Sequence, residues 1–553
     1  MGKRPNFLIL FADQQRYDTI NAAGYDYMKT PNLDRLANEG CIFQNAYSPN
    51  PVCMPARHYM MTGQSARAHG YYGNINVPIK DEGIPTIPQA LSDNGYNTAA
   101  IGKMHFYPPR RHHGFDEMHL MEEIPHSRLD DAYLQYLEKE GLGGIRNIHG
   151  VRPALYHTPQ KALMPEKDHG VNWVANKTVD WLEKNGNDPF FLVCGWIKPH
   201  PPWNIPEEWE GLYKNVDLPE VLPLSREFPF VSEKSDWFGD NDPDDMKRKI
   251  REAYYTSISM VDAAVGRVLE CLERKGLLDD TFIIYTSDHG EMLQDKGFYS
   301  KGLPFESSAH IPFVVRHPEN FQGGSKDERF VDLLDLFPTI LAAAGIDYNY
   351  KESNQNYPLA GMSFLDKDIH RDYQFADYAS GASRWVMTRD KRYKYVYYYN
   401  GGTEFFYDMQ EDPFELNNLV KSDAMPQDDF DRLKKVCIEY EKARGPEECV
   451  KNDDFVALPP KEFNPGWDSS KFPGWANSQF QRFGKESPER EAEIFLQELR
   501  NALCDNTSNI RKYIIENPAW LEELGKNFNS IGGKDEDLAE ALEKNSQKRS
   551  VKK

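Results

Sequence analysis

A cysteine and an arginine four residues after it are the first candidates for chemistry in this sequence. They lie in residues 50–64, which read Asn-Pro-Val-Cys-Met-Pro-Ala-Arg-His-Tyr-Met-Met-Thr-Gly-Gln. This order predicts a helix start, because Pro55 suits a first turn, where its missing N–H is not needed. Arg57 would then lie on the same side as Cys53, and the helix dipole would favour negative charge near the thiol. Residue types alone leave open whether Cys53 is a reactive group or, as most lone cysteines are, a buried free thiol.

Other polar residues with chemical potential follow apolar runs. Such runs, rich in β-type residues, are typical of strands that are buried on both faces. The runs and the polar residues after them are Asn6–Ala12 with Asp13 and Gln14, Thr98–Ile101 with Lys103 and His105, Phe190–Ile197 with His200, and Thr281–Thr286 with Asp288, His289 and, in the next loop, Lys301.

These strands must be positioned by a common sheet. Strands that alternate with helices predict an α/β fold, in which a large, mainly parallel sheet is sandwiched by helices. In such sheets ligands bind outside the carboxyl ends of the strands. We therefore expect the polar residues after the four runs to share one site.

The pattern changes after about residue 380. Residues 385–388, 392–399 and 404–407, with a Gly-Gly turn between the last two, predict an antiparallel sheet whose tyrosines form a half-buried face. Residues 485–545 are charged and helical in pattern. We expect a catalytic domain, a smaller C-terminal α+β subdomain built on the antiparallel sheet, and a charged helical extension, which span 1–375, 376–450 and 451–553.

Composition narrows the class of protein. The net charge of −21 at pH 7, with no basic stripe to offset it, argues against nucleic acid as a partner, and no apolar run approaches a membrane span. The run Phe7–Ala12 is too short for a signal peptide, and seven cysteines without paired spacing fit a reducing compartment. We expect a cytoplasmic protein, or a periplasmic or secreted one if a preceding signal has been removed. We expect the extension either to cover the core or to support a homo-oligomer.

The segment around Cys53 resembles a known family signature. Cys53-x-Pro55-x-Arg57 followed by Thr62-Gly63 is similar to the signature of the type I sulfatases, in the alkaline phosphatase superfamily. The resemblance extends from about residue 4 to about residue 420. It implies an alkaline phosphatase-like fold and the hydrolysis of sulfate esters. It also implies that a formylglycine-generating maturation enzyme oxidises Cys53 to formylglycine, whose hydrate is the nucleophile.

The resemblance implies one divalent cation as well. Its ligands would be Asp13, Gln14, Asp288 and His289, and the modified Cys53 would complete the shell. The family often has aspartate and asparagine where this chain has Gln14 and His289, a pair found in choline sulfatases, phosphonate monoester hydrolases and some carbohydrate sulfatases. Oxygen ligands favour a hard cation, and we expect Ca²⁺, with Mg²⁺ as an alternative; the imidazole also leaves Mn²⁺ open.

The remaining roles are also implied by the resemblance. Arg57 would hold the hydrate and neutralise the acids around the metal. His200 would protonate the leaving oxygen, and His105 would remove a proton from the second hydroxyl so that sulfate is expelled. The residues expected to bind the sulfuryl oxygens are Lys103, Lys301, Asn74 and His200.

The expected substrate is a small-molecule or oligosaccharide sulfate ester, such as a sulfated carbohydrate. Specificity would lie in loops, here Arg110, Arg111 and residues 201–245. A phosphonate monoester or phosphodiester hydrolase on the same scaffold is the alternative, and Lys103-x-His105 resembles the sulfatase pattern instead. A carbohydrate-binding protein with a degenerate site is a further alternative, which the presence of every catalytic group opposes.

Overall fold

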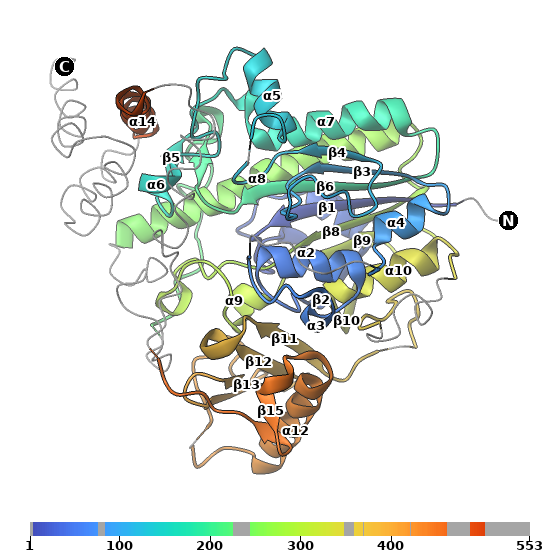
Figure 1. Cartoon of the computed structure of the whole chain (residues 1–553), viewed down its shortest axis with the longest axis vertical. Coiled ribbons are helices and arrows are strands. Elements are labelled where there is room, and N and C mark those ends of the chain that lie inside the picture. The colour runs from blue at the N-terminus through green and yellow to red at the C-terminus, as the bar shows by residue number, and fades with distance from the viewer. Residues whose placement is uncertain are drawn as a thin grey trace.

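The computed structural model describes residues 4–75, 83–125, 127–224, 244–347, 359–368, 370–420, 422–461 and 487–503 (Figure 1). Its main layer is an eight-stranded sheet. In spatial order the strands are β10 (Ser325–Asp332), β2 (Cys41–Tyr47), β9 (Phe313–Arg316), β8 (Thr281–Ser287), β1 (Asn6–Asp13), β6 (Phe190–Pro199), β3 (Asn97–Gly102) and β4 (Glu117–Leu120). β9 runs antiparallel to both of its neighbours, and the other neighbouring pairs are parallel.

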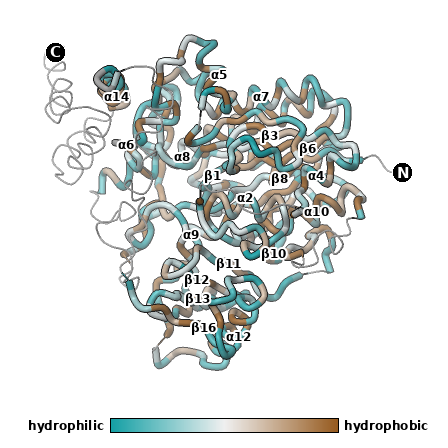
Figure 2. Tube along the Cα trace, viewed as in Figure 1, coloured by the Kyte–Doolittle hydropathy of each residue, from teal (hydrophilic) through white to brown (hydrophobic). Residues whose placement is uncertain are grey.

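Helices cover both faces of this sheet. The side chains of β1 alternate between two cores: Leu8 and Leu10 face one, and Ile9 and Phe11 face the other. The first core is closed by α1 (Pro31–Asn38), α5 (Ala132–Lys139), α7 (Gly170–Asn185) and α8 (Asp244–Arg274). The second is closed by α2 (Cys53–Thr62), α4 (Ile87–Ser92) and α10 (Leu336–Ala343). Because both faces are buried, the central strands are hydrophobic along their length (Figure 2). The predicted mainly parallel α/β sheet is confirmed.

A second, antiparallel sheet follows in the chain. It consists of β11 (Gln374–Tyr378), β12 (Trp385–Arg389), β13 (Tyr393–Tyr398) and β14 (Thr403–Asp408). The prediction of a half-buried tyrosine face was wrong, because every residue of β13 is buried. On one face Tyr395 packs against α12 (Gln427–Arg444), and on the other Tyr398 packs with residues of the larger domain such as Phe305.

Shorter elements connect these layers. They are α3 (Ala66–His69), α6 (Arg152–Leu155), α9 (Glu306–Ala309), β5 (Gln160–Lys161), β7 (Asn204–Ile205), β15 (Val450–Lys451), β16 (Asp454–Phe455) and the 3₁₀ turns η1 (Asn21–Ala23), η2 (Glu166–Asp168), η3 (Glu207–Trp209), η4 (Asp295–Gly297), η5 (Leu333–Asp335), η6 (Gly381–Ser383) and η7 (Glu447–Cys449).

Two predicted segments are described only in part. Within the loop predicted at 201–245, residues 225–243 lie outside the described residues. Of the C-terminal extension, the structure describes 451–461 and 487–503, which contains α14 (Pro488–Ala502). Residues 504–553, and most of the helical pattern predicted at 485–545, lie outside the described residues.

Candidate active site

Parallel strands bring the predicted polar residues to one edge of the large sheet. The strands β8, β1, β6 and β3 are neighbours in that order. Asp13 is the last residue of β1, and Asp288, His200 and Lys103 each directly follow the end of β8, β6 and β3. Since parallel strands end on the same side, four segments distant in sequence deliver their side chains to one place.

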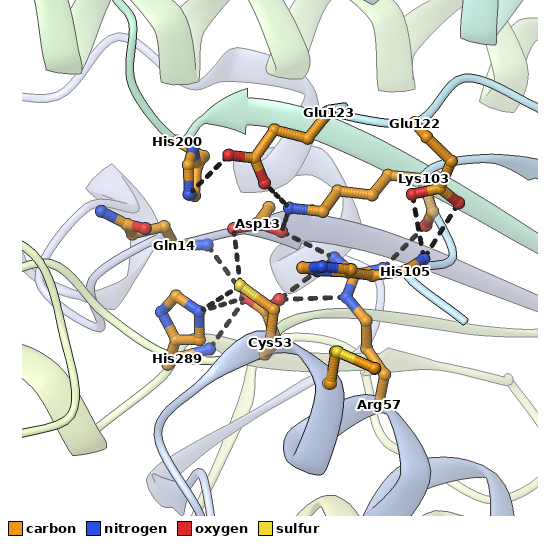
Figure 3. Close-up of polar contacts among 12 residues, drawn as sticks. Asp13, Gln14, Cys53, Arg57, Lys103, His105, Glu122, Glu123, His200 and His289 are labelled. Carbon is orange, nitrogen blue, oxygen red and sulfur yellow. Dashed lines mark hydrogen bonds and ion pairs between the residues drawn. The ribbon is translucent and has the colours of Figure 1, made fainter. Parts of the chain in front are cut away.

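Cys53 faces this edge from the first position of α2 (Figure 3). Its Sγ lies 3.2 Å from His289 Nε2 and 3.9 Å from Asp13 Oδ1. Together with Asp288, these residues form a cluster whose candidate ligand atoms all lie within 4.8 Å of one another, and all four residues are buried. A thiol, two carboxylates and an imidazole therefore converge on one point.

Arg57 holds the two carboxylates of this cluster. Its Nη2 donates to Asp13 Oδ2 at 2.9 Å, and its Nε donates to Asp288 Oδ2 at 3.1 Å. Nη1 donates to the Lys103 carbonyl at 2.7 Å, and the guanidinium lies 4.9 Å from the centre of the Phe11 ring. Because Arg57 is one helical turn after Cys53, α2 presents the thiol and the neutralising cation on one side.

Electrostatics favour an ionised Cys53. Burial raises the pKa of its thiol and the Asp13 carboxylate does the same, but Lys301, Lys103 and His289 outweigh them, so that this pKa lies well below its ordinary value. Burial also raises the pKa of Asp288, yet His289 and Arg57 bring it below its ordinary value. The edge of the sheet is thus a place where anions are stabilised.

Lys103 lies between two carboxylates. Its Nζ is 2.6 Å from Asp13 Oδ2 and 2.6 Å from Glu123 Oε2. Lys103 is fully buried, and although burial lowers its pKa, these carboxylates raise it above its ordinary value. Lys103 therefore stays charged in the interior.

Lys301 has different partners. Its Nζ donates to Gln14 Oε1 at 2.5 Å and to His200 Nε2 at 2.9 Å. Gln14 has φ 66°, in the left-handed region, and its backbone N–H donates to Asp288 Oδ1 at 3.0 Å while its Nε2 donates to Glu291. The Gln14 side chain is thus oriented by Lys301 and Glu291 next to the cluster.

The hydrogen bonds of His200 show which of its ring nitrogens carries the hydrogen. Nδ1 lies 2.6 Å from the Pro201 carbonyl oxygen, which can only accept, so Nδ1 carries a hydrogen. Nε2 then accepts from Lys301 in the neutral ring and lies 3.5 Å from Glu123 Oε1. Burial lowers the pKa of His200, Lys301 lowers it further, and Glu123 opposes them, with a net value well below the ordinary one.

Two predicted residues occupy the edges of the site. The backbone N–H of His105 donates to Glu122 Oε1 at 3.0 Å, and its buried Nδ1 has no hydrogen-bond partner among the described residues. The side-chain oxygen of Asn74 accepts from the Met54 N–H at 2.9 Å, so Asn74 stabilises the helix start that carries Cys53. Arg110, expected to influence specificity, is exposed and donates to the Asp130 carbonyl at 3.4 Å.

Sequence reasoning missed Glu122, Glu123 and Arg152. The two glutamates follow β4, a parallel edge strand beside β3, so the rule that located Lys103 applies to them as well. The signal was weak because β4 reads Glu-Met-His-Leu rather than as an apolar run. Arg152 forms an ion pair with Glu123, and no pattern in the sequence predicts this contact.

Comparison with known proteins identifies the family. The family model "Sulfatase" matches residues 5–346. The chain belongs to the sulfatase family. A second model, "N-sulphoglucosamine sulphohydrolase, C-terminal", matches residues 294–442 of this sulfatase. An arylsulfatase of Clostridium perfringens is 31% identical over 483 residues, which cover 80% of this chain and 95% of that protein.

Solved structures share the fold. The phosphonate monoester hydrolase of Agrobacterium radiobacter superposes with a TM-score of 0.67 at 24% identity, covering 83% of this sulfatase and 100% of that chain. A protein solved with its substrate D-glucosamine-2-N,6-O-disulfate has a TM-score of 0.61 at 21% identity, covering 80% and 98%. At these identities the likeness establishes the alkaline phosphatase-like fold.

The cluster fits the metal ion that the family uses. Asp13, Cys53, Asp288 and His289 offer anionic and imidazole donors to one point, and Asp288 Oδ1 is oriented by the N–H groups of Gln14 and His289.

The part of the chain that the structure describes contains no helix long and apolar enough to cross a membrane.

Proposed function

We propose that this sulfatase hydrolyses sulfate esters of sugars or other small organic molecules, using formylglycine formed from Cys53 and one divalent cation. The observation that carries the proposal is the position of Cys53 Sγ, 3.2 Å from His289 Nε2 and 3.9 Å from Asp13 Oδ1, at the start of α2. A nucleophile, metal donors and cations meet there and serve an anionic substrate.

The proposed reaction needs two further groups. Formylglycine at position 53, installed by a maturation enzyme, would supply as its hydrate the attacking oxygen and a second hydroxyl. The cation, for which we propose Ca²⁺ with Mg²⁺ or Mn²⁺ as alternatives, would supply Lewis acidity. Asp13, Gln14, Asp288 and His289 would hold this cation.

The cations of the chain bind and orient the sulfuryl group. Arg57 and Lys103 offset the carboxylates, which would otherwise repel an anion. Lys301 contacts the neutral Gln14 amide and His200 ring, so its charge is available to a sulfuryl oxygen. Asn74 contributes by holding the helix start in place.

The two histidines would move protons at stated atoms. Bound anionic substrate raises the pKa of His200, and its Nε2 then carries the proton that the leaving oxygen receives, with Glu123 stabilising the imidazolium. The buried ring nitrogen Nδ1 of His105 has no hydrogen-bond partner among the described residues. We assign it the proton of the second hydroxyl, whose loss expels sulfate.

The decisive test examines residue 53. Peptide mass spectrometry of active protein should find residue 53 lighter than cysteine, because the oxidation replaces a thiol with an aldehyde. Cys53→Ala should remain folded and lose about 10⁴-fold or more of the rate on 4-nitrophenyl sulfate. Full activity with an unmodified thiol would overturn the mechanism.

Phosphonate monoesters and phosphodiesters are a second candidate substrate class, because the solved phosphonate monoester hydrolase shares this fold. The motif Lys103-x-His105 resembles the sulfatase pattern and favours a sulfate monoester. The ratio of kcat/KM values for esters with one common leaving group decides between the classes. We expect it to favour sulfate, and a ratio in favour of phosphodiesters would make the second candidate the better function.

A further inference from the structure

Helix α14 lies near α6 and β5 at one side of the large domain, although it comes from the C-terminal extension (Figure 1). It packs near β5, and its residues Ala492, Phe495 and Leu499 join the same core as Ile148 and Val151. These helix residues recur every three or four positions, so one apolar stripe faces the large domain. Helix α14 is therefore packed against the large domain through a shared hydrophobic core.

Two buried glutamates interrupt this stripe. Glu491 and Glu498 are seven residues apart, which places them on one side of the helix, and they are only 5% and 7% exposed. A helix that merely covered apolar surface would not bury carboxylates, since a buried charge is unfavourable unless it is paired and hydrogen-bonded. Their partners therefore indicate what the helix does.

Both glutamates hold the start of one segment. The two Glu491 oxygens accept from the Arg146 guanidinium at 3.1 and 3.2 Å. Glu498 accepts from the backbone N–H of Arg146 at 2.6 Å and from that of Asn147 at 3.1 Å, and also from Asn147 Nδ2 at 2.6 Å. A carboxylate that binds two successive backbone amides fixes the direction of the chain there.

That segment, residues 145–157, continues into the active site. His149 Nε2 lies 3.1 Å from the Glu122 carbonyl oxygen, and Arg152 forms an ion pair with Glu123, which in turn contacts Lys103 and His200. The Arg152 guanidinium also lies 4.5 Å from the centre of the Tyr156 ring. The segment thus supports the glutamate that binds two of the proposed catalytic residues.

The far end of the segment reaches the other side of the same site. The Tyr156 ring lies 6.2 Å from the His200 ring. The His157 ring stacks on Tyr299 at 4.4 Å, two residues before Lys301. Segment 145–157 therefore borders the place where the leaving group of a sulfate ester would lie, beside its proposed acid.

We propose that α14 is a positioning element of the active site: Glu491 and Glu498 fix segment 145–157, and this segment holds Arg152 and Tyr156 against Glu123 and His200. The C-terminal extension thereby shapes the leaving-group side of the site. The effect of the leaving-group side on sulfate ester hydrolysis rests on the proposed function. The positioning of segment 145–157 by α14 does not depend on that function.

The test uses two isosteric changes on one helix of the full chain. Glu498→Gln leaves one oxygen to accept from two backbone N–H groups, so one amide faces an NH₂ group. The matched control is Glu493→Gln, which removes the same charge from an exposed residue of α14 that pairs with Arg490. Amide hydrogen exchange should accelerate in residues 146–157 in Glu498→Gln and remain unchanged in Glu493→Gln.

Kinetics then separate positioning from general support. Glu498→Gln should lower kcat/KM about tenfold for a sugar sulfate and less than about twofold for 4-nitrophenyl sulfate, whose leaving group needs no proton. In an Arg152→Met background the further effect of Glu498→Gln should shrink, because both changes act through one contact. Equal losses on both substrates in step with a lower Tm, or unchanged exchange in residues 146–157, would overturn the proposal.

If Glu498→Gln does not fold, Arg146→Met provides the same test from the other side of the Glu491 contact. It should accelerate exchange in residues 147–157 and lose rate selectively on the sugar sulfate. Unchanged exchange or equal loss on both substrates would again overturn the proposal. If the wild-type protein released no sulfate from any ester, the proposed function would be refuted. The exchange measurement would still test whether α14 positions segment 145–157.

Discussion

Two buried clusters of charge in this sulfatase differ in how their cations are partnered. One is the active site. The other, the Glu306 cluster, lies where the antiparallel sheet meets the large domain and consists of Glu306, Glu415, Lys394, Arg389, Tyr47 and His310. There Lys394 Nζ lies 3.0 Å from Glu306 and 2.6 Å from Glu415, and Arg389 lies 3.3 Å from Glu306. Each cation of this cluster has a carboxylate partner.

The active site lacks this balance at Lys301. Its Nζ contacts a neutral amide and a neutral imidazole, and among the described residues no carboxylate lies within ion-pair distance of it. Burial lowers the pKa of Lys301, but the nearby Cys53, Tyr156 and Asp13 raise it above its ordinary value, so the ammonium stays charged without a direct ion pair. The Glu306 cluster therefore stabilises an interface through direct ion pairs, whereas an anionic substrate would supply the direct partner that Lys301 lacks among the described residues. Substitutions in the two clusters and around them test this difference.

Removing a carboxylate from the proposed metal set should have the largest effect. Asp288→Asn keeps the volume but loses the anionic donor, so bound metal should be lost and the rate on 4-nitrophenyl sulfate should fall by about 10⁴-fold. Metal analysis and steady-state kinetics measure both, and chelation of the wild type should abolish turnover. The control is Asp377→Asn. Asp377 is a buried aspartate of the smaller sheet that pairs with Arg384 at 3.2 Å, so its variant should retain the metal. Stoichiometric metal in Asp288→Asn would refute the assignment.

The role of His200 should depend on the leaving group. His200→Ala should lose about 10²–10⁴-fold on a sugar sulfate, whose alkoxide needs a proton, and much less on 4-nitrophenyl sulfate. His105→Ala should instead show an initial burst of product and then slow turnover on both substrates, because its proposed task follows departure of the leaving group. Burst and steady-state kinetics distinguish these outcomes. Equal losses on both substrates in a folded His200→Ala would remove the acid role.

The two buried lysines should respond in opposite ways. Lys301→Met removes a cation that has no carboxylate in direct contact among the described residues, so stability should change by less than about 1 kcal/mol while kcat/KM for sulfate esters falls about 10²-fold. Lys394→Met strands Glu306 and Glu415, so the free energy of unfolding should fall by about 3 kcal/mol with little change in kcat of the folded protein. Urea unfolding with activity assays on both variants measures this. A large loss of stability in Lys301→Met would remove the contrast.

The smallest effect on activity should come from Glu306. Burial raises its pKa, but Lys394, Arg389 and His310 hold it well below the ordinary value of 4.5. A carboxyl whose pKa is lowered by folding stabilises the fold above its unfolded pKa, and this contribution is lost as the pH falls below about 4.5. Glu306→Gln should therefore weaken the acid dependence of Tm and leave kcat near neutral pH unchanged. An identical Tm profile from pH 7 to pH 3 in the variant and the wild type would contradict this account.

Much of the site could be predicted because it depends on local patterns. Apolar runs identify buried parallel strands, and such strands end at one edge of the sheet, so the sequence alone assigns Asp13, Lys103, His200 and Asp288 to one place. The helix start at Cys53 and the one-turn spacing to Arg57 are equally local. These features follow from the periods of strands and helices, which a sequence displays directly.

Contacts between distant segments were decided only by the tertiary structure. Glu123 joins Lys103 because the short polar strand β4 pairs with β3, and Lys301 meets Gln14 and His200 because a loop after β8 turns back over the sheet. Glu498 reaches the Arg146 amide from 352 positions along the chain. The sequence by itself determined which residues could take part and which strands carry them. Packing determined which charges meet, because pairing across such separations depends on the whole fold and leaves no local period in the sequence.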